Sequence, residues 1–182
     1  MSVSTGERHR AELALEGRRS AENLGVLEGL VWPSVADRIR QARLQAGLSD
    51  TEVARRVGLT VHTYFDLELT NDEAFTVVSL RHLVELGRIL GTNPRVLFLG
   101  CEGEGVKQTV ALADVSARLS KKMLEDGLTA EQLGDLIGWD ITSLLRDPKS
   151  LLEFNVEALY AMCKAVDLDW VAALPDAKDS CL

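Results

Sequence analysis

Cysteine, histidine and long apolar runs are scarce in this sequence, and each scarcity excludes a class of protein. The three cysteines, Cys101, Cys163 and Cys181, form no C-x-x-C pair, so they indicate neither a zinc site nor a disulfide framework. No apolar run approaches the roughly 18 residues that cross a bilayer, and the start lacks the basic-then-apolar order of a secretory signal. We therefore expect a cytoplasmic protein with no metal, no cofactor and no membrane partner.

Motifs of catalysis are also missing. The histidines are His9, His62 and His82, and none belongs to an H-E-x-x-H, G-x-S-x-G or phosphate-loop pattern. We expect His82 to face solvent on a helix and Cys163 to be a small core residue. The sequence thus predicts that the chain is not an enzyme.

What the sequence does contain is a pattern over residues 39–68 that is typical of two short helices joined by a tight turn. Gly47 follows an apolar-periodic segment, at a place where a helix ends in a left-handed residue. Ser49 and Glu52 have the S-x-x-E spacing of a capping box at the next helix, and Gly58 makes the turn after it. Such a unit is a helix-turn-helix motif; an ordinary helical bundle is the alternative.

This run resembles the Cro/C1-type (XRE) family of phage repressors and bacterial regulators. The similarity covers about residues 34–100, because a leucine series followed by glycine and proline fits the closing helices of that family. These residues are Leu80, Leu83, Leu86, Leu90, Gly91 and Pro94. The resemblance implies a five-helix domain in which Arg43 pairs with Glu68, and we expect this ion pair to be partly buried and to brace the motif.

A weaker copy of the pattern recurs at a shift of 80 residues, which falls to 76 after the third helix. The matching positions are Gly47 with Gly127, Ser49 with Thr129, Glu52 with Gln132 and Gly58 with Gly138. The bracing pair is absent from the copy, where Met123 and Pro148 stand in its two places. Two copies at this spacing predict two tandem helical units rather than a solenoid; chance similarity between amphipathic segments is the alternative.

The predicted fold class is therefore all-α, with two tandem five-helix lambda-repressor-like helix-turn-helix units behind an N-terminal helical extension. The extension covers 1–33 and is either helical or mobile. The first helix-turn-helix domain covers 34–100, a linker 101–108, the degenerate second domain 109–175, and a tail 176–182. The linker assignment follows from two glycines and the absence of periodicity.

Charge argues against strong general affinity for DNA. Residues 34–100 hold eight basic and eight acidic side chains, and residues 101–182 hold eight basic and fifteen acidic ones. Because DNA binding draws much of its affinity from cations that neutralise phosphates, the acidic second half favours a protein partner or serves solubility.

The resemblance also implies which residues would contact DNA. The base-reading positions are Val61, His62 and Asp66, and the remaining phosphate partners are Arg43, Thr51, Arg55, Thr60 and Thr63. Asp66 can only accept a hydrogen bond from cytosine and repels phosphate. Asp50 replaces a glutamine that contacts phosphate in the family, which departs from the pattern.

Aromatic residues allow another interpretation. Phe65 occupies a position of the third helix that is usually polar, and an exposed aromatic there suits protein contact. We expect instead that the following loop folds back and covers Phe65 through Phe75. Trp32, Trp139 and Trp170 are expected to be packing residues.

Two functions remain open. The first is a DNA-binding transcriptional regulator of the Cro/C1 type, which would bind double-stranded DNA as a homodimer. The second is a protein-interaction module that kept the helix-turn-helix scaffold without its DNA face. The first predicts that Arg40, Arg43, Arg55 and Arg56 converge on a positive rim beside the third helix; carboxylates around His62 and Thr63 would contradict it.

Overall fold

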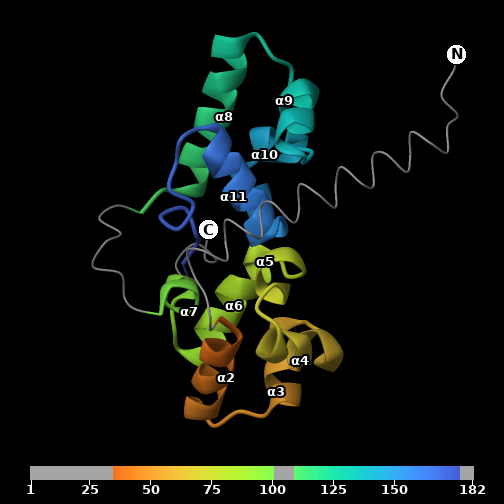
Figure 1. Cartoon of the computed structure of the whole chain (residues 1–182), viewed down its shortest axis with the longest axis vertical. Helices are drawn as coiled ribbons and strands as arrows, with labels where there is room; N and C mark the ends of the chain where they lie inside the picture. The colour runs from red at the N-terminus through yellow and green to blue at the C-terminus, as the bar shows by residue number, and fades with distance from the viewer. Residues whose placement is uncertain (1–34, 101–108, 177–182) are drawn as a thin grey trace, which may run out of the picture. The chain divides into compact units, whose positions relative to one another are not determined.

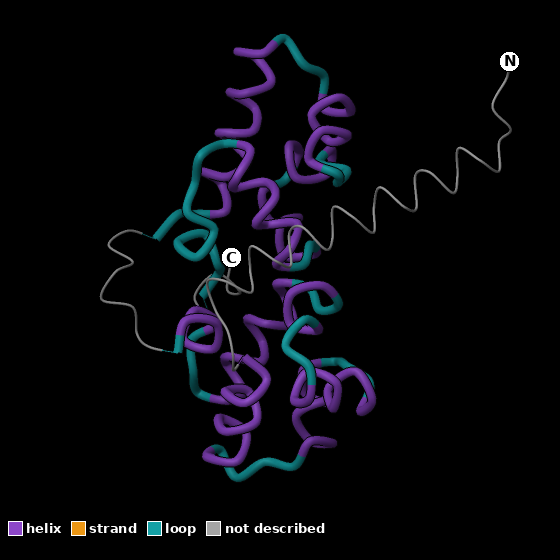
Figure 2. Tube along the Cα trace, viewed as in Figure 1, coloured by secondary structure: helices purple, strands orange, loops and turns teal. Residues whose placement is uncertain are grey.

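A computed structural model describes residues 35–100, here called the first half, and residues 109–176, the second half (Figures 1 and 2). The first half contains α2 (Val35–Gln45), α3 (Asp50–Val57), α4 (Val61–Leu69), α5 (Glu73–Thr76), α6 (Leu80–Leu90) and α7 (Pro94–Leu99). The second half contains α8 (Leu112–Asp126), α9 (Ala130–Ile137), α10 (Thr142–Arg146), the 3-10 helix η1 (Pro148–Glu153) and α11 (Val156–Ala165). Every regular element in these two ranges is helical, which confirms the all-α class there.

The predicted extension 1–33, the linker 101–108 and the end of the tail lie outside the described residues, as do His9, Trp32, Cys101 and Cys181. None of the helices in the two halves is both long enough and apolar enough to cross a membrane.

Caps and left-handed glycines set the bounds of the short helices. The Ser49 side chain accepts a hydrogen bond from the Glu52 amide at the start of α3, and Gly58 ends that helix with φ of 85°. The predicted capping box is only half formed, because the Glu52 carboxylate binds the Arg56 guanidinium one turn later. The prediction of a complete box at α3 was therefore wrong: an ion pair on the same helix takes the carboxylate that would reach back to the cap.

The core of the first half surrounds α4, which packs on α2 and α3 while α3 also contacts α6. Tyr64 and Leu67 are the inward residues of α4 and are 0% and 1% exposed. Leu83 and Leu86 are among the buried residues of α6. This packing uses one side of α4 and leaves its opposite side facing outward.

An aromatic cluster joins the two halves. The rings of Phe75 and Phe98 lie edge to face with centroids 4.9 Å apart, and Trp170 from the second half lies 6.4 Å and 6.3 Å from them. Arg95 of α7 also donates a 2.8 Å hydrogen bond to the carbonyl of Leu174. Buried aromatic rings contribute much of the stability of a core. Because rings from both halves pack in this one cluster, the two halves share a core.

Backbone hydrogen bonds tie the halves together at a second place. The amide of Leu80 donates to the carbonyl of Phe154 at 2.7 Å. The Asn155 side chain, which caps α11, donates to the carbonyl of Thr76 at 2.6 Å. The end of α5 and the start of α6 are thus held against the start of α11.

Three single residues test the sequence expectations. Cys163 is 0% exposed, as expected of a core residue, and burial raises the pKa of its thiol to about 12. Trp170 is 6% exposed, as expected of a packing residue. His82 does not face solvent as expected: it is half-buried, its Nδ1 lies 2.9 Å from the Ser79 hydroxyl that caps α6, and burial lowers its pKa.

Candidate interaction face on helix α4

Helix α4 is the third helix of the predicted helix-turn-helix unit, the helix that the resemblance assigns to DNA. Its start is fixed by Thr60, whose hydroxyl accepts a 3.0 Å hydrogen bond from the amide of Thr63. The two hydroxyl oxygens of this pair also lie 2.8 Å apart. Tyr64 and Leu67 then anchor the helix in the core, which determines which of its side chains point outward.

Three apolar side chains recur every fourth residue on the outward side of α4. Val61, Phe65 and Leu69 are 47%, 49% and 59% exposed. Residues at this spacing lie next to one another on a helix surface, so the three side chains form a continuous ridge. Together with His62 and Asp66 they make up what we call the α4 outer face.

The expectation that Phe75 would cover Phe65 was wrong. Phe75 is 0% exposed and belongs to the aromatic cluster with Phe98 and Trp170. The loop after α4 forms the short helix α5, which directs Phe75 into the core beside the second half. Phe65 consequently stays half exposed.

The predicted base-reading residues lie together on this face, but a carboxylate stands among them. The His62 side chain is 87% exposed, and its Nε2 lies 3.6 Å from Oδ2 of Asp66, which is 33% exposed. A hydrogen-bond donor at His62 is therefore accompanied by an acceptor that repels phosphate.

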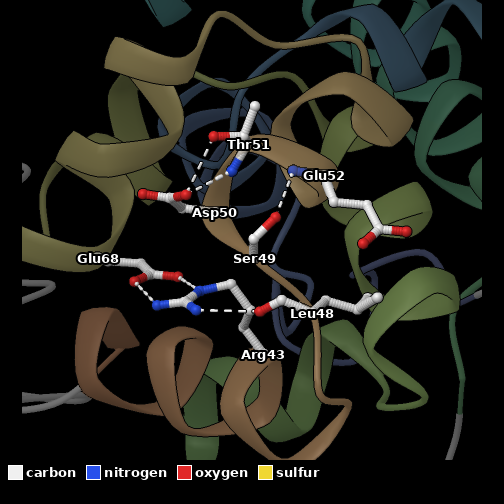
Figure 3. A network of polar contacts seen from close by, with 7 residues as sticks. All are labelled: Arg43, Leu48, Ser49, Asp50, Thr51, Glu52 and Glu68. Atoms are coloured by element: carbon white, nitrogen blue, oxygen red, sulfur yellow. Dashed lines mark hydrogen bonds and ion pairs between the residues drawn. The ribbon is translucent and has the colours of Figure 1, made fainter.

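Arg43, a predicted phosphate partner, is occupied inside the fold (Figure 3). Its Nε and Nη2 donate to the two Glu68 oxygens at 2.5 Å and 2.8 Å, and its Nη1 donates to the carbonyl of Leu48 at 3.1 Å. The side chains of Arg43 and Glu68 are only 14% and 8% exposed. The Glu68 hydrogen bonds raise the pKa of Arg43 above its ordinary value; this arginine braces α2 against α4.

The other predicted phosphate partners offer little positive charge. Arg55 is exposed on α3 and Thr51 is exposed at its start. The amide and hydroxyl of Thr51, however, both bind Oδ1 of Asp50, at 2.6 Å and 3.2 Å (Figure 3). A carboxylate thus occupies the helix N-terminus where a phosphate would otherwise bind.

Of the four arginines expected to form a positive rim, two are paired with carboxylates. Arg43 binds Glu68, and Arg56 binds Glu52. Only Arg40 and Arg55 remain as exposed cations without a carboxylate partner among those four. The face beside α4 therefore has a mixed charge.

Under the outer face, the Tyr64 hydroxyl is buried and lacks a hydrogen-bond partner. It lies beside the Glu68 carboxylate, and both oxygens of that carboxylate are bound by Arg43. Burial, and after it the Glu68 carboxylate, raise the pKa of Tyr64 well above its ordinary value.

We predict that Tyr64→Phe leaves the free energy of unfolding unchanged or raises it by up to about 1 kcal/mol, because an unsatisfied buried hydroxyl costs desolvation energy. Urea unfolding monitored by circular dichroism measures the change. A loss of more than 1 kcal/mol would mean that the hydroxyl does make a stabilising bond.

The sequence reasoning singled out Phe65 but missed the ridge. The resemblance assigns Val61 to base contact and gives Leu69 no role, although the four-residue spacing of both from Phe65 is visible in the sequence. Exposed leucines also lie outside the ridge, in the second half, where Leu124 of α8 is 84% exposed and Leu136 of α9 is 70% exposed.

The described residues contain no cluster of three or more histidine, cysteine or acidic side chains that could hold a metal ion. Comparison of the chain with protein-family models, with curated proteins and with solved structures finds no match.

Proposed function

We propose that residues 35–100 are a helix-turn-helix domain of the Cro/C1 type that binds protein, rather than DNA, through the α4 outer face. The observation that carries this proposal is the ridge of Val61, Phe65 and Leu69, half exposed on the helix that would read DNA. An apolar ridge gains little in a groove lined by phosphates, whereas aromatic and aliphatic anchors dominate protein interfaces.

The distribution of charge supports the same proposal. DNA affinity depends on cations that are free to neutralise phosphates, and Arg43 is held in the fold by Glu68 and Leu48. Asp50 places a carboxylate at the start of α3, and Asp66 places one on the outward side of α4, where each would approach the duplex. Each carboxylate repels phosphate at a place where DNA binding would need positive charge.

We further propose that the second half is a degenerate copy of the first. Helices α3 and α9 both have eight residues, and their bounds differ by the shift of 80 seen in the sequence. The glycines that end them have φ of 85° and 88°. Helix α10 has five residues against nine in α4, so the helix that corresponds to the one with the outer face is four residues shorter in the copy.

DNA binding is kept as the second candidate because α4 is accessible. His62 is 87% exposed, and Arg55 is exposed on the preceding helix. The His62 side chain could donate a hydrogen bond to a base edge, and the Arg55 side chain could bind a phosphate.

A mobility-shift assay separates the two candidates. The full chain is titrated onto pooled genomic fragments at low salt, alongside His62→Ala and Arg55→Ala. The proposal predicts no discrete shifted band. A discrete band that both substitutions weaken about tenfold or more would overturn the proposal in favour of DNA binding, because losing a base or phosphate contact costs on the order of 1–3 kcal/mol.

A capture experiment tests whether the α4 outer face binds protein. Wild-type chain, Phe65→Glu and Leu136→Glu are immobilised and exposed to an extract of the source cells. Leu136 is a matched control because it is an exposed apolar residue outside the α4 outer face. Proteins retained by the wild type and by Leu136→Glu should be lost with Phe65→Glu; equal retention by all three would contradict the proposal.

A further inference from the structure

We propose that the α4 outer face binds a second copy of this chain, with the two α4 helices antiparallel across a two-fold axis near Phe65. This inference rests on the proposed function, since it names the protein partner of the same face. It follows from the order of the residues along the helix and from their exposure.

The ridge is symmetric about its middle residue. Phe65 stands four residues from Val61 on one side and four from Leu69 on the other, and all three side chains are about half exposed. A two-fold interface must be self-complementary, because each patch meets its own copy. In an antiparallel pair, Phe65 lies near the partner's Phe65 and Val61 faces the partner's Leu69, so aromatic meets aromatic and aliphatic meets aliphatic.

The polar residues of the face favour the antiparallel arrangement. His62 and Asp66 form a second ridge beside the first, with the exposed imidazole 3.6 Å from the carboxylate. An antiparallel partner brings its Asp66 toward His62 and its His62 toward Asp66, so that each imidazole can donate to a carboxylate. In a parallel two-fold pair the two polar ridges would lie on opposite sides of the apolar contact, so no such hydrogen bond would form between the copies.

Helix packing geometry allows the contact. Two ridges with four-residue spacing interdigitate when helices cross at about 50°, with their axes about 8–10 Å apart. The nine residues of α4 offer a short contact, smaller than the roughly 800 Å² per partner of a standard interface. We therefore expect a weak dimer with a Kd in the micromolar range or above. The dimer would cover α4 and compete with any binding of DNA to it.

Analytical ultracentrifugation of the full chain between micromolar and submillimolar concentrations tests the inference. We expect the wild type to change from monomer to dimer over this range, and Phe65→Glu to weaken the dimer at least about a hundredfold, since the substitution acts in both copies and buries two carboxylates against apolar side chains. Leu136→Glu makes the same change of charge at an exposed leucine elsewhere and should leave the dimer unchanged. A monomeric wild type, or a dimer that survives Phe65→Glu, overturns the inference.

A disulfide trap tests the register independently of any loss of folding. In a Cys101→Ser and Cys181→Ser background, Phe65→Cys should form an intermolecular disulfide on mild oxidation, because antiparallel helices in contact bring equivalent Cα atoms within the 4.4–6.8 Å range that a disulfide spans. Leu136→Cys is the control and should remain monomeric; equal crosslinking of the two variants overturns the antiparallel register.

The experiments also separate this inference from the function on which it rests. A monomeric wild type whose capture of another protein depends on Phe65 removes the self-association and keeps the proposed function. An unaltered capture profile for Phe65→Glu, together with a DNA shift that depends on Arg55 and His62, removes both.

Discussion

Replacing Trp170 with alanine is expected to lower the free energy of unfolding of both halves by about 4 kcal/mol, since large-to-small changes at buried aromatic side chains cost about 3–5 kcal/mol. The indole is 6% exposed and lies within 6.4 Å of the rings of Phe75, Phe98 and Tyr160. Phe75 and Phe98 belong to the first half, so the cavity left by the substitution opens in a core that the two halves share.

Urea unfolding monitored by circular dichroism measures the loss, and hydrogen exchange shows where it is felt. We expect faster exchange in α6 and α7 of the first half as well as in α11. Trp139→Ala is the matched control: this ring is half-buried and contacts Phe154 of its own half, so the cost should be smaller, about 1–2 kcal/mol. Native exchange rates throughout the first half of Trp170→Ala would contradict the shared core.

The local elements of the first half could be predicted because their signals are local. Gly58 adopts the left-handed backbone that the turn needs, with φ of 85°, and Ser49 and Thr60 cap the helices on either side. Each of these features depends on residues within one helical turn. The sequence therefore predicts where α3 begins and ends and where α4 begins without any knowledge of tertiary contacts.

The fate of the two phenylalanines depends on contacts that the sequence pattern does not contain. Phe75 is buried between Phe98 of its own half and Trp170, both of which are distant in the sequence. The residues near Phe65 and Phe75 in the sequence do not show which of the two rings is buried. The contact with the second half decides between them, and it leaves Phe65 at the surface.

Similar reasoning applies to charge. The sequence shows that the basic and acidic residues of 34–100 are equal in number, but only the geometry shows which cations are paired. Arg56 lies one turn from Glu52, and a helix makes that pair from sequence neighbours. The Arg95 hydrogen bonds to the carbonyls of Ala172 and Leu174, by contrast, join distant segments and could not be predicted.

The second large effect is expected at the ion pair that braces α2 against α4. Glu68→Ala should lower the free energy of unfolding by about 3 kcal/mol, because removing one partner leaves a largely buried charge unpaired. The Arg43 guanidinium, whose side chain is 14% exposed, would keep only its 3.1 Å bond to the carbonyl of Leu48. The reciprocal change, Arg43→Ala, should cost a similar amount, since Glu68 is 8% exposed.

A double substitution separates the cost of breaking this pair from the value of the pair itself. In Arg43→Met with Glu68→Leu, apolar side chains of similar length fill the same space and no buried charge remains. Replacing a buried ion pair in this way is often neutral or stabilising, so we expect the double variant to recover to within about 1 kcal/mol of the wild type. Glu52→Ala, which frees Arg56 at the surface, is the control and should cost less than about 1 kcal/mol.

Urea unfolding of the two single variants and the double variant gives the coupling free energy directly. A coupling of more than about 2 kcal/mol, with a stable double variant, would mean that Arg43 serves the fold and is not available to a phosphate. If both single substitutions were nearly silent, the guanidinium would be free to leave Glu68, and the DNA-binding candidate would regain a cation beside α4. The stability of this pair therefore bears on function as well as on folding: the more firmly Glu68 holds Arg43, the less positive charge the α4 face can offer to a duplex.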